Sequence, residues 1–388
     1  MTPAARFAAA IEVLDRIGGG LAAEKALTNW ARGNRFAGSG DRYALRDIVF
    51  DVLRCKRSFG ALGGAETGRS LVLGALRAAG IAPDEVFTGQ GYAPAVLTEA
   101  EIAGGVVPGG MAALDCPDWL APALQASLGD GFEGVMQALQ SRAPVFLRVN
   151  LRKSNAAASM AALAAEGIET RPHPLAQTSL EVLSNPRKIK TSKAFLDGLV
   201  ELQDAASQAI VEALPLAGTK RVLDFCAGGG GKTLAMAAQS DAAFFAHDIA
   251  PARMKDLPAR AKRAGVRVTV LEGRALAQAA PFDLVLADAP CTGSGSWRRA
   301  PEAKWALTQQ RLESLLETQC LIMDRASALV RPGGCFAYAT CSLLQSENQD
   351  QVAAFLVRAR EWRLLSSRSL TPLDGGDGFF IACFLRDF

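Results

Sequence analysis

Residues 284–287, Leu-Val-Leu-Ala, form an uninterrupted apolar run between Asp283 and Asp288. Such a short run is typical of a strand buried in a parallel sheet. Pro290 follows it and restricts the backbone of its neighbours, so we expect Asp288 and Cys291 to project from a stiff corner. Ligands of open α/β sheets bind at this carboxyl edge. A second predicted strand, residues 335–339, leads into Thr340-Cys341. The sequence therefore predicts two thiols facing one crevice.

Predicted strands and helices alternate from about residue 202 onward. We expect strands at residues 221–225, 243–248, 268–271, 284–287 and 335–339, a helix at 308–330, and an antiparallel hairpin made of 362–365 and 379–385. This alternation predicts an α/β fold, a Rossmann-like doubly wound sheet with a terminal antiparallel hairpin, as the catalytic domain at residues 201–388.

Two further domains are predicted before the sheet. Residues 1–105 show helical periodicity, with helices expected at 22–31 and 42–57, and residues 106–200 predict a linker helix and a small α+β module. Cations gather at Arg32, Arg35, Arg42, Arg46, Arg54, Lys56 and Arg57, and in the loop 185–193. These stretches could contact phosphates or simply be solvated, and both interpretations stay open for the helical part.

Composition excludes several classes of protein. The 388 residues include no apolar run of 18, and the first 16 lack a signal-peptide layout, so no membrane association is expected. Eight cysteines without a Cys-x-x-Cys pair, together with two histidines, argue against a disulfide framework and against a metal site. We therefore expect a cytoplasmic protein with free thiols.

The turn after the strand 221–225 is rich in glycine: Cys226-Ala227-Gly228-Gly229-Gly230-Gly231-Lys232-Thr233. A phosphate-binding loop would need glycine where Cys226 stands, so nucleotide hydrolysis is disfavoured. Asp248 lies 20 positions after Gly228, the spacing at which a carboxylate meets a ribose diol. A dinucleotide and S-adenosyl-L-methionine both remain possible, and the second would place Asp224 and the glycine backbone against a methionine moiety.

Cysteine thiolates can activate pyrimidine carbons. A thiolate that adds to C6 of cytosine gives C5 the nucleophilic character needed to accept a methyl group. Cys341, Cys291 and Asp288 offer a nucleophile, an acid-base group and a carboxylate for the base edge. We expect the remaining cysteines outside the glycine turn to be inert: Cys55, Cys116, Cys320, Cys335 and Cys383.

With these motifs the chain resembles a known family, the RsmB/Sun-type RNA 5-methylcytosine methyltransferases. The matching segments are residues 203–208, 223–227, 230–233, 283–295, 298–305, 338–342 with Glu347-Asn348, and 377–380. Residues 40–47 with Val52-Leu53-Arg54 resemble NusB-type RNA-binding helical domains, which some members of the family carry.

The resemblance implies the following roles. Cys341 would be the attacking thiolate, Cys291 would release the methylated product, and Asp288 and Lys232 would contact the cytosine. The cofactor would be S-adenosyl-L-methionine, held by Cys226, Ala227, Gly228, Gly230, Lys232, Asp248, Arg253, Glu272 and Asp288. Glu272 stands where the family usually has aspartate, and Gly228-Gly229 where it often has Ala-Pro.

Other functions stay open beside this one. DNA cytosine methyltransferases would use Cys291 as the nucleophile, but their Pro-Cys-Gln and Glu-Asn-Val motifs are missing. RNA is favoured as the partner, because its loops offer unstacked bases. Ribosomal RNA is the first expectation and transfer RNA the second, with a monomeric enzyme. A non-catalytic RNA-binding or assembly factor with the same fold is the competing hypothesis.

Overall fold

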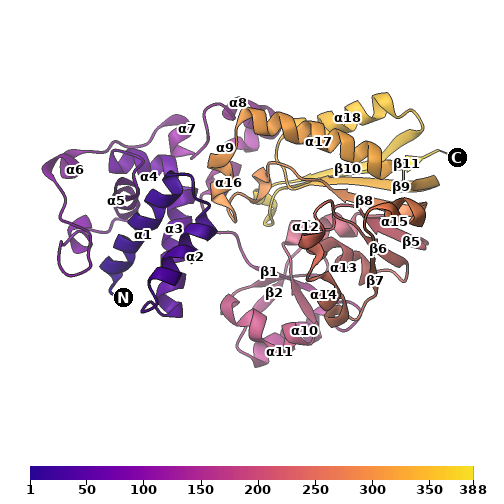
Figure 1. Cartoon of the computed structure of the whole chain (residues 1–388), viewed down its shortest axis with the longest axis horizontal. Coiled ribbons are helices and arrows are strands. Elements are labelled where there is room, and N and C mark those ends of the chain that lie inside the picture. The colour runs from indigo at the N-terminus through magenta and orange to yellow at the C-terminus, as the bar shows by residue number, and fades with distance from the viewer. Residues whose placement is uncertain (388) are drawn as a thin grey trace. The chain divides into compact units, whose positions relative to one another are not determined.

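The computed structural model describes residues 1–387, which form two compact units (Figure 1). The first unit contains Met1–Arg142 and the short segment Trp297–Ala306. The second contains Ala143–Ser296 and the chain from Leu307 onward. The small α+β module and the large sheet thus share one unit by their contacts, while the division into three domains stays a prediction.

The first unit is built from helices, as predicted. Their bounds are α1 Pro3–Gly18, α2 Ala23–Gly33, α3 Ser39–Arg54, α4 Lys56–Gly63, α5 Gly68–Ala78, α6 Glu99–Ala103, α7 Gly110–Ala113, α8 Ala121–Leu128, α9 Phe132–Leu139 and α16 Pro301–Ala306. Apolar side chains at helical spacing on α1, α2, α3 and α5 form its core, including Val13, Trp30, Val49 and Leu73.

The prediction of a single helix over residues 42–57 is wrong at the C-terminal end. Helix α3 stops at Arg54, Cys55 leaves the helical conformation, and α4 begins at Lys56. The buried carboxylate of Asp115 accepts hydrogen bonds from the backbone N–H groups of Arg57 (2.8 Å) and Ser58 (3.0 Å). It thereby caps the new helix from a distant position in the chain, which local periodicity does not reveal.

The segment Trp297–Ala306 is part of this helical core. Trp305 Nε1 donates to Leu53 O (2.6 Å), and the buried Lys304 Nζ donates to Arg54 O (3.2 Å). Glu302 accepts a hydrogen bond from Ala23 N at the start of α2 (2.5 Å). A stretch that follows the Cys291 loop in sequence therefore folds with the N-terminal helices.

Helices α4 and α5 touch through their backbones, which gives a first testable prediction. A Cβ atom on Gly74 would lie 1.8 Å from Phe59 O, so Gly74→Ala must push the two helices apart. We expect it to destabilise the helical unit by about 1–3 kcal/mol, the usual cost of overpacking, in urea unfolding. Gly40→Ala in α3 is the matched control, since nothing lies within 4 Å of that position and alanine favours helix there. Equal stability of Gly74→Ala and the wild type would contradict the prediction.

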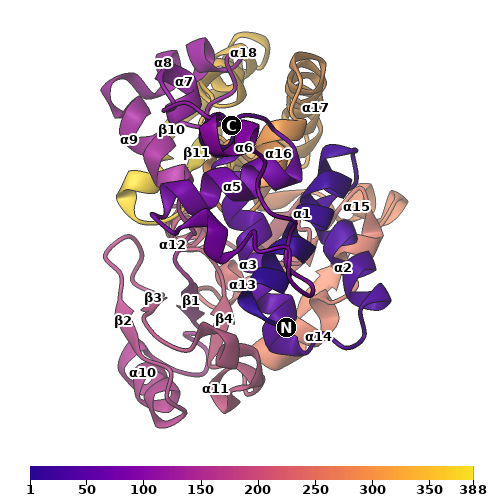
Figure 2. The same cartoon turned by 90° about the vertical axis from the view of Figure 1, so that its left-hand side faces the viewer.

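The second unit begins with a small antiparallel sheet (Figure 2). Its strands are β1 Phe146–Val149, β2 Thr170–Pro172, β3 Ser179–Val182 and β4 Val200–Leu202, in the order β2-β3-β1-β4. Helices α10 Ala156–Ala165 and α11 Lys193–Leu196 complete it around Leu147, Leu163 and Ile189. The predicted small α+β module is thus present.

The large sheet confirms the predicted Rossmann-like fold. Its strands are β5 Arg221–Asp224, β6 Ala243–Ala246, β7 Val268–Val270, β8 Phe282–Asp288, β9 Val330–Thr340, β10 Trp362–Leu370 and β11 Phe379–Arg386, in the order β10-β11-β9-β8-β5-β6-β7. The five strands from β9 to β7 in this order are parallel, and β11 and β10 add the predicted antiparallel hairpin.

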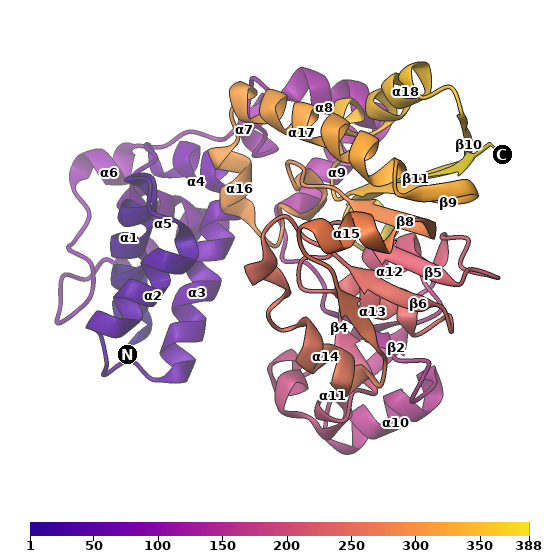
Figure 3. The same cartoon turned by 45° about the vertical axis from the view of Figure 1, so that its right-hand side comes forward.

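Helices cover both faces of this sheet (Figure 3). Alternate residues of β9 point to opposite faces: Ala337 and Ala339 pack with α12 Ala205–Glu212 and α13 Gly231–Ala237, whereas Phe336 and Tyr338 pack with α17 Gln309–Ser327 and α18 Gln349–Arg358. Two shorter helices, α14 Leu257–Ala264 and α15 Arg274–Ala279, follow β6 and β7. Helix α18 was not among the predicted elements.

No helix within residues 1–387 has the length and apolar character needed to cross a membrane.

Candidate active site

The predicted site residues gather at the carboxyl edge of the parallel strands. Asp224 ends β5, Asp288 ends β8, and Cys341 directly follows β9. Strands β8 and β9 are neighbours in register, with Asp288 opposite Ala339, and Ala289 N donates to Ala339 O (2.8 Å). This pairing brings the loop that carries Cys291 beside the loop that carries Cys341.

The two thiols are in contact. Cys291 Sγ lies 3.4 Å from Cys341 Sγ, and both side chains are partly buried. The hydrogen bond to Cys341, together with burial, raises the pKa of Cys291 well above its ordinary value. The contact places the Cys291 thiol where it can donate a hydrogen bond to the sulfur of Cys341.

Lys232, near the start of α13, forms an ion pair with Asp288 (Nζ to Oδ2, 2.6 Å). Burial would lower the pKa of Lys232, but the attraction of Asp288 outweighs it and the pKa is raised. The negative charge of a Cys341 thiolate also acts on this ammonium. Lys232 therefore stays charged in a mostly buried position, where a cation stabilises a nearby thiolate.

The glycine turn wraps around Asp248. Gly228 N donates to Asp248 Oδ2 (2.9 Å), and Ala250 N donates to Oδ1 (2.9 Å). Gly228 and Gly230 have φ of 52° and 80°, and a Cβ on Gly230 would lie 2.2 Å from Leu257 Cδ1. Glycine is required at such positions because other residues are strained there. The turn is thus shaped around the carboxylate that sequence spacing predicted for the ribose.

Asp224 has an unused acceptor. Its Oδ2 accepts a hydrogen bond from Thr233 Oγ1 (2.6 Å), whereas its Oδ1, buried as well, has no hydrogen-bond partner among residues 1–387. Burial raises the pKa of Asp224 to about 7. A buried acceptor without a partner is costly. An ammonium group such as that of a bound amino acid moiety would satisfy it.

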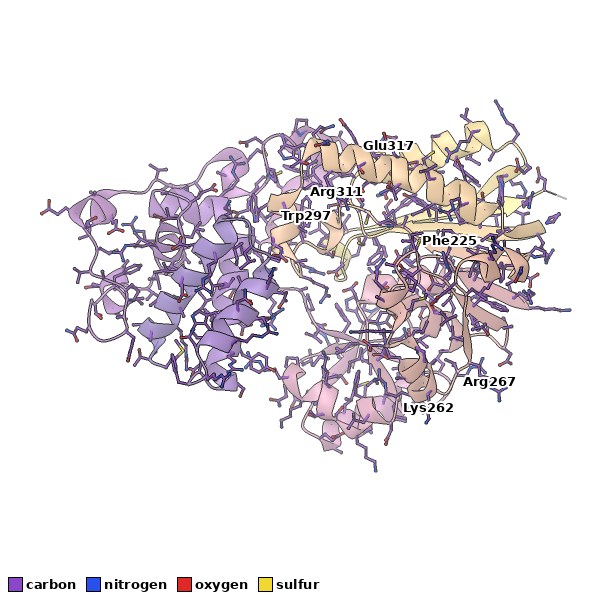
Figure 4. All side chains as sticks on the ribbon, viewed as in Figure 1. Phe225, Lys262, Arg267, Trp297, Arg311 and Glu317 are labelled. Atoms are coloured by element: carbon purple, nitrogen blue, oxygen red, sulfur yellow. The ribbon has the colours of Figure 1, made fainter. Side chains whose placement is uncertain are left out.

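A pocket beside this turn has apolar walls. Its lining includes Phe225 and Cys226, whose thiol has a raised pKa because of burial, together with Asp248 and Arg253. Phe225 is labelled among the strands of the large sheet in Figure 4. The remaining lining residues come from the loop after β6, the Pro290 corner and α17: His247, Ile249, Pro290, Thr318, Leu321, Ile322 and Arg325. Ile249 and Leu321, both in this lining, are 80% and 62% exposed.

The sequence predicted pocket residues of the glycine turn and the loop after β6, but none of α17. Ala227 N donates to His247 O (2.9 Å), and Arg253, which lines the pocket, pairs with Asp248 (3.1 Å); that either residue contacts the cofactor stays a prediction. Glu272 is exposed and is not among the lining side chains of residues 1–387. The contributions of His247 and α17 had no sequence signal, because an exposed leucine on a helix has many explanations.

Much of the basic surface predicted on the helical unit is neutralised. Arg46, Arg54 and Arg57 pair with Glu24, Asp51 and Asp118, and Lys56 pairs with Glu66. Arg32, Arg35 and Arg42 are exposed.

These features define the class of protein. A largely parallel sheet with a glycine turn, a carboxylate bonded by that turn, a second buried carboxylate with one free oxygen and an apolar pocket together fit S-adenosylmethionine, and the protein is a methyltransferase of the Rossmann-like class.

Comparisons with known proteins agree. Residues 211–384 match the family described as 16S rRNA methyltransferase RsmB/F, and residues 116–190 match its ferredoxin-like domain. The chain belongs to the RsmB/F methyltransferase family, which confirms both the predicted family and the predicted cofactor.

A curated relative agrees with the family, and two solved structures agree with the fold. The ribosomal RNA small subunit methyltransferase B of Klebsiella pneumoniae is 32% identical over 286 residues, which cover 70% of this chain and 66% of that protein. The crystal structure of PH0851 has a similar fold, with a TM-score of 0.77, 24% identity and 99% of each chain covered. A methyltransferase homologue from Pyrococcus horikoshii gives a TM-score of 0.63 at 24% identity, covering 71% of this chain and 97% of its own.

Proposed function

We propose that this protein methylates C5 of cytosine in RNA, through a covalent bond between Cys341 and C6 of the base. The observation that carries the proposal is the 3.4 Å contact between the Cys291 and Cys341 thiols, beside the Lys232–Asp288 ion pair. One thiol explains adduct formation, and the second explains how the adduct is resolved. A methyltransferase that acts on a nitrogen or an oxygen atom needs neither.

The chemistry follows from the positions of these side chains. The Cys341 thiolate, favoured by the nearby Lys232 ammonium, adds to C6, and the electron pair of the C5–C6 double bond moves to C5. When bound, S-adenosylmethionine would supply an electrophilic methyl group to C5 and leave as S-adenosylhomocysteine. A base then removes the C5 proton, the C5–C6 double bond re-forms, and the Cys341 thiolate leaves. Cys291, in contact with Cys341, is assigned to this release step.

Asp288 and Lys232 are assigned to the cytosine. A carboxylate can accept a hydrogen bond from the exocyclic amine or the protonated N3, and an ammonium can donate to the base carbonyl. The Asp288 side chain is 30% exposed, so part of the carboxylate is accessible to a base. Asp248 is assigned to the cofactor ribose and Asp224 to its ammonium group.

RNA is supported as the substrate by exposed cations on the second unit. Lys188, Lys190 and Lys193 are exposed on the small module, and Lys262 and Arg267 extend outward at α14 and the loop after it (Figure 4). Such side chains hold phosphates without reading sequence. Small-subunit ribosomal RNA is the first substrate to test, because the matched relatives are named for it.

The test uses the full chain, S-adenosylmethionine and RNA carrying tritium at cytosine C5. Methylation at C5 must displace this hydrogen, so we expect tritium release together with 5-methylcytidine in the digested RNA. Small-subunit ribosomal RNA, transfer RNA and DNA of matching sequence form the three arms. Methylation without tritium release would contradict the C5 assignment. RNA binding with no methyl transfer to any arm would favour the assembly-factor hypothesis.

A further inference from the structure

A buried carboxylate connects the two cysteine loops. Glu347 is fully buried at the end of a short 3-10 helix after β9, Gln345–Glu347. Its Oε1 accepts hydrogen bonds from Thr292 N (2.9 Å) and Gln319 Nε2 (2.9 Å). Its Oε2 accepts from Thr292 Oγ1 (2.5 Å) and from Ser342 Oγ. Thr292 directly follows Cys291, and Ser342 directly follows Cys341, so the neighbours of both thiols bind one side chain.

Further bonds tie the same two loops together. Ser294 Oγ lies 3.2 Å from Ser342 Oγ and accepts a hydrogen bond from Leu343 N (2.8 Å), and Gly295 N donates to Cys341 O (2.9 Å). Each of these bonds joins the loop after β8 to the loop after β9. Glu347 lies at the centre of this network, because its two oxygens alone receive four hydrogen bonds.

A buried carboxyl group of this kind is retained at a cost, since its burial is unfavourable unless its oxygens are well bonded. An apolar side chain could fill the same space but could not accept four donors from three segments of chain. The hydrogen bonds of Glu347 within residues 1–387 go to Thr292, Gln319 and Ser342 and not to either sulfur. Its contacts are suited to fixing the backbone on both sides.

We infer that Glu347 is a positioning residue, whose carboxylate holds the Cys291 and Cys341 thiols in contact. The inference rests on the proposed function in so far as those thiols act on the same cytosine. The geometric part of it, that Glu347 sets the separation of the thiols, holds for the protein whether or not RNA is the substrate.

The separation of the thiols can be measured without any substrate. Phenylarsine oxide condenses with two neighbouring thiols to form two As–S bonds and one water molecule, without oxidation or reduction. We expect the full-length wild type to bind it through Cys291 and Cys341, with Cys291→Ser giving the baseline for the other cysteines. Glu347→Ala should weaken this capture at least about tenfold, because bidentate binding depends on the effective concentration of the second thiol.

Kinetics provide the second readout. We expect Glu347→Ala to lower kcat for methyl transfer about 100-fold with little change in KM for RNA, since a misplacement of about 1 Å at a reacting group can cost this much. Ser342→Ala removes one anchor and should show a smaller loss. In the Glu347→Ala background the Ser342→Ala change should add little, because both remove the same connection. Glu313→Gln, an exposed carboxylate on α17, is the matched control and should behave as wild type.

The outcomes separate the two proposals. Arsenical capture and kcat both unchanged in folded Glu347→Ala would overturn the inference. If Glu347→Ala fails to bind S-adenosylhomocysteine and is unfolded, Ser342→Ala decides: normal capture and normal kcat there would overturn the inference as well. If the wild type captures the arsenical, and Glu347→Ala does not, but no RNA is methylated, the proposed function fails while the positioning role stands.

Discussion

Replacing Cys291 with alanine is expected to trap the protein on its RNA. The thiolate of Cys341 remains in this variant and can add to C6, and the methyl group can still be transferred. Release of the product is slowed because the thiol in contact with Cys341 is gone. We expect a covalent RNA–protein species that survives denaturing gel electrophoresis, and methyl label that stays on the protein band.

Cys341→Ala is the counterpart to this experiment. Without the nucleophile, neither adduct nor methylated RNA should form, and activity should fall on the order of 10⁴-fold or more, as for other enzymes that lose a nucleophile. Both variants should bind S-adenosylhomocysteine like the wild type, which controls for folding. An adduct in Cys341→Ala, or normal turnover in Cys291→Ala, would exchange the roles of the two residues.

The position of the two thiols could be predicted because it follows from general rules of α/β sheets. The buried run 284–287 and the strand ending at Thr340 each lead to a cysteine, and carboxyl ends of parallel strands meet at one edge. The structure adds the step that the sequence could not supply, namely that β8 and β9 are direct neighbours. This adjacency converts two cysteines at one edge into a pair in contact.

The features that sequence reasoning missed depend on partners far apart in the chain. Asp115 caps the start of α4 by accepting hydrogen bonds from residues more than 50 positions earlier in the chain. Leu321 and Ile322 of α17 line the pocket beside the glycine turn, although nothing in their local pattern distinguishes them from other helix residues. Glu347 was noted as part of a matching motif, but its role depends on Thr292 and Gln319, which only the folded chain brings to it.

The second large effect is expected at Asp224, as a dependence of cofactor affinity on pH. In the free protein burial raises the pKa of Asp224 to about 7, so the carboxyl holds its proton below that pH. The ammonium group of the cofactor needs the ionised form, and binding therefore releases this proton. We expect the affinity for S-adenosylhomocysteine to be level above pH 7 and to weaken roughly tenfold for each pH unit below it. Isothermal titration calorimetry in two buffers with different ionisation enthalpies measures both the affinity and the proton release.

Asp224→Asn tests whether this residue is the source of the effect. The amide keeps the shape of the side chain but lacks the charge, so affinity at pH 8 should fall about 30-fold or more, in line with the 2–5 kcal/mol lost when one partner of a buried charge pair is truncated. The remaining affinity of the Asp224→Asn variant for S-adenosylhomocysteine should no longer change between pH 6 and 8. Asp248→Asn should also weaken binding, through the ribose, but should leave the change near pH 7 in place. A wild-type affinity that is constant between pH 6 and 8 would show that the ammonium group does not meet an ionised Asp224.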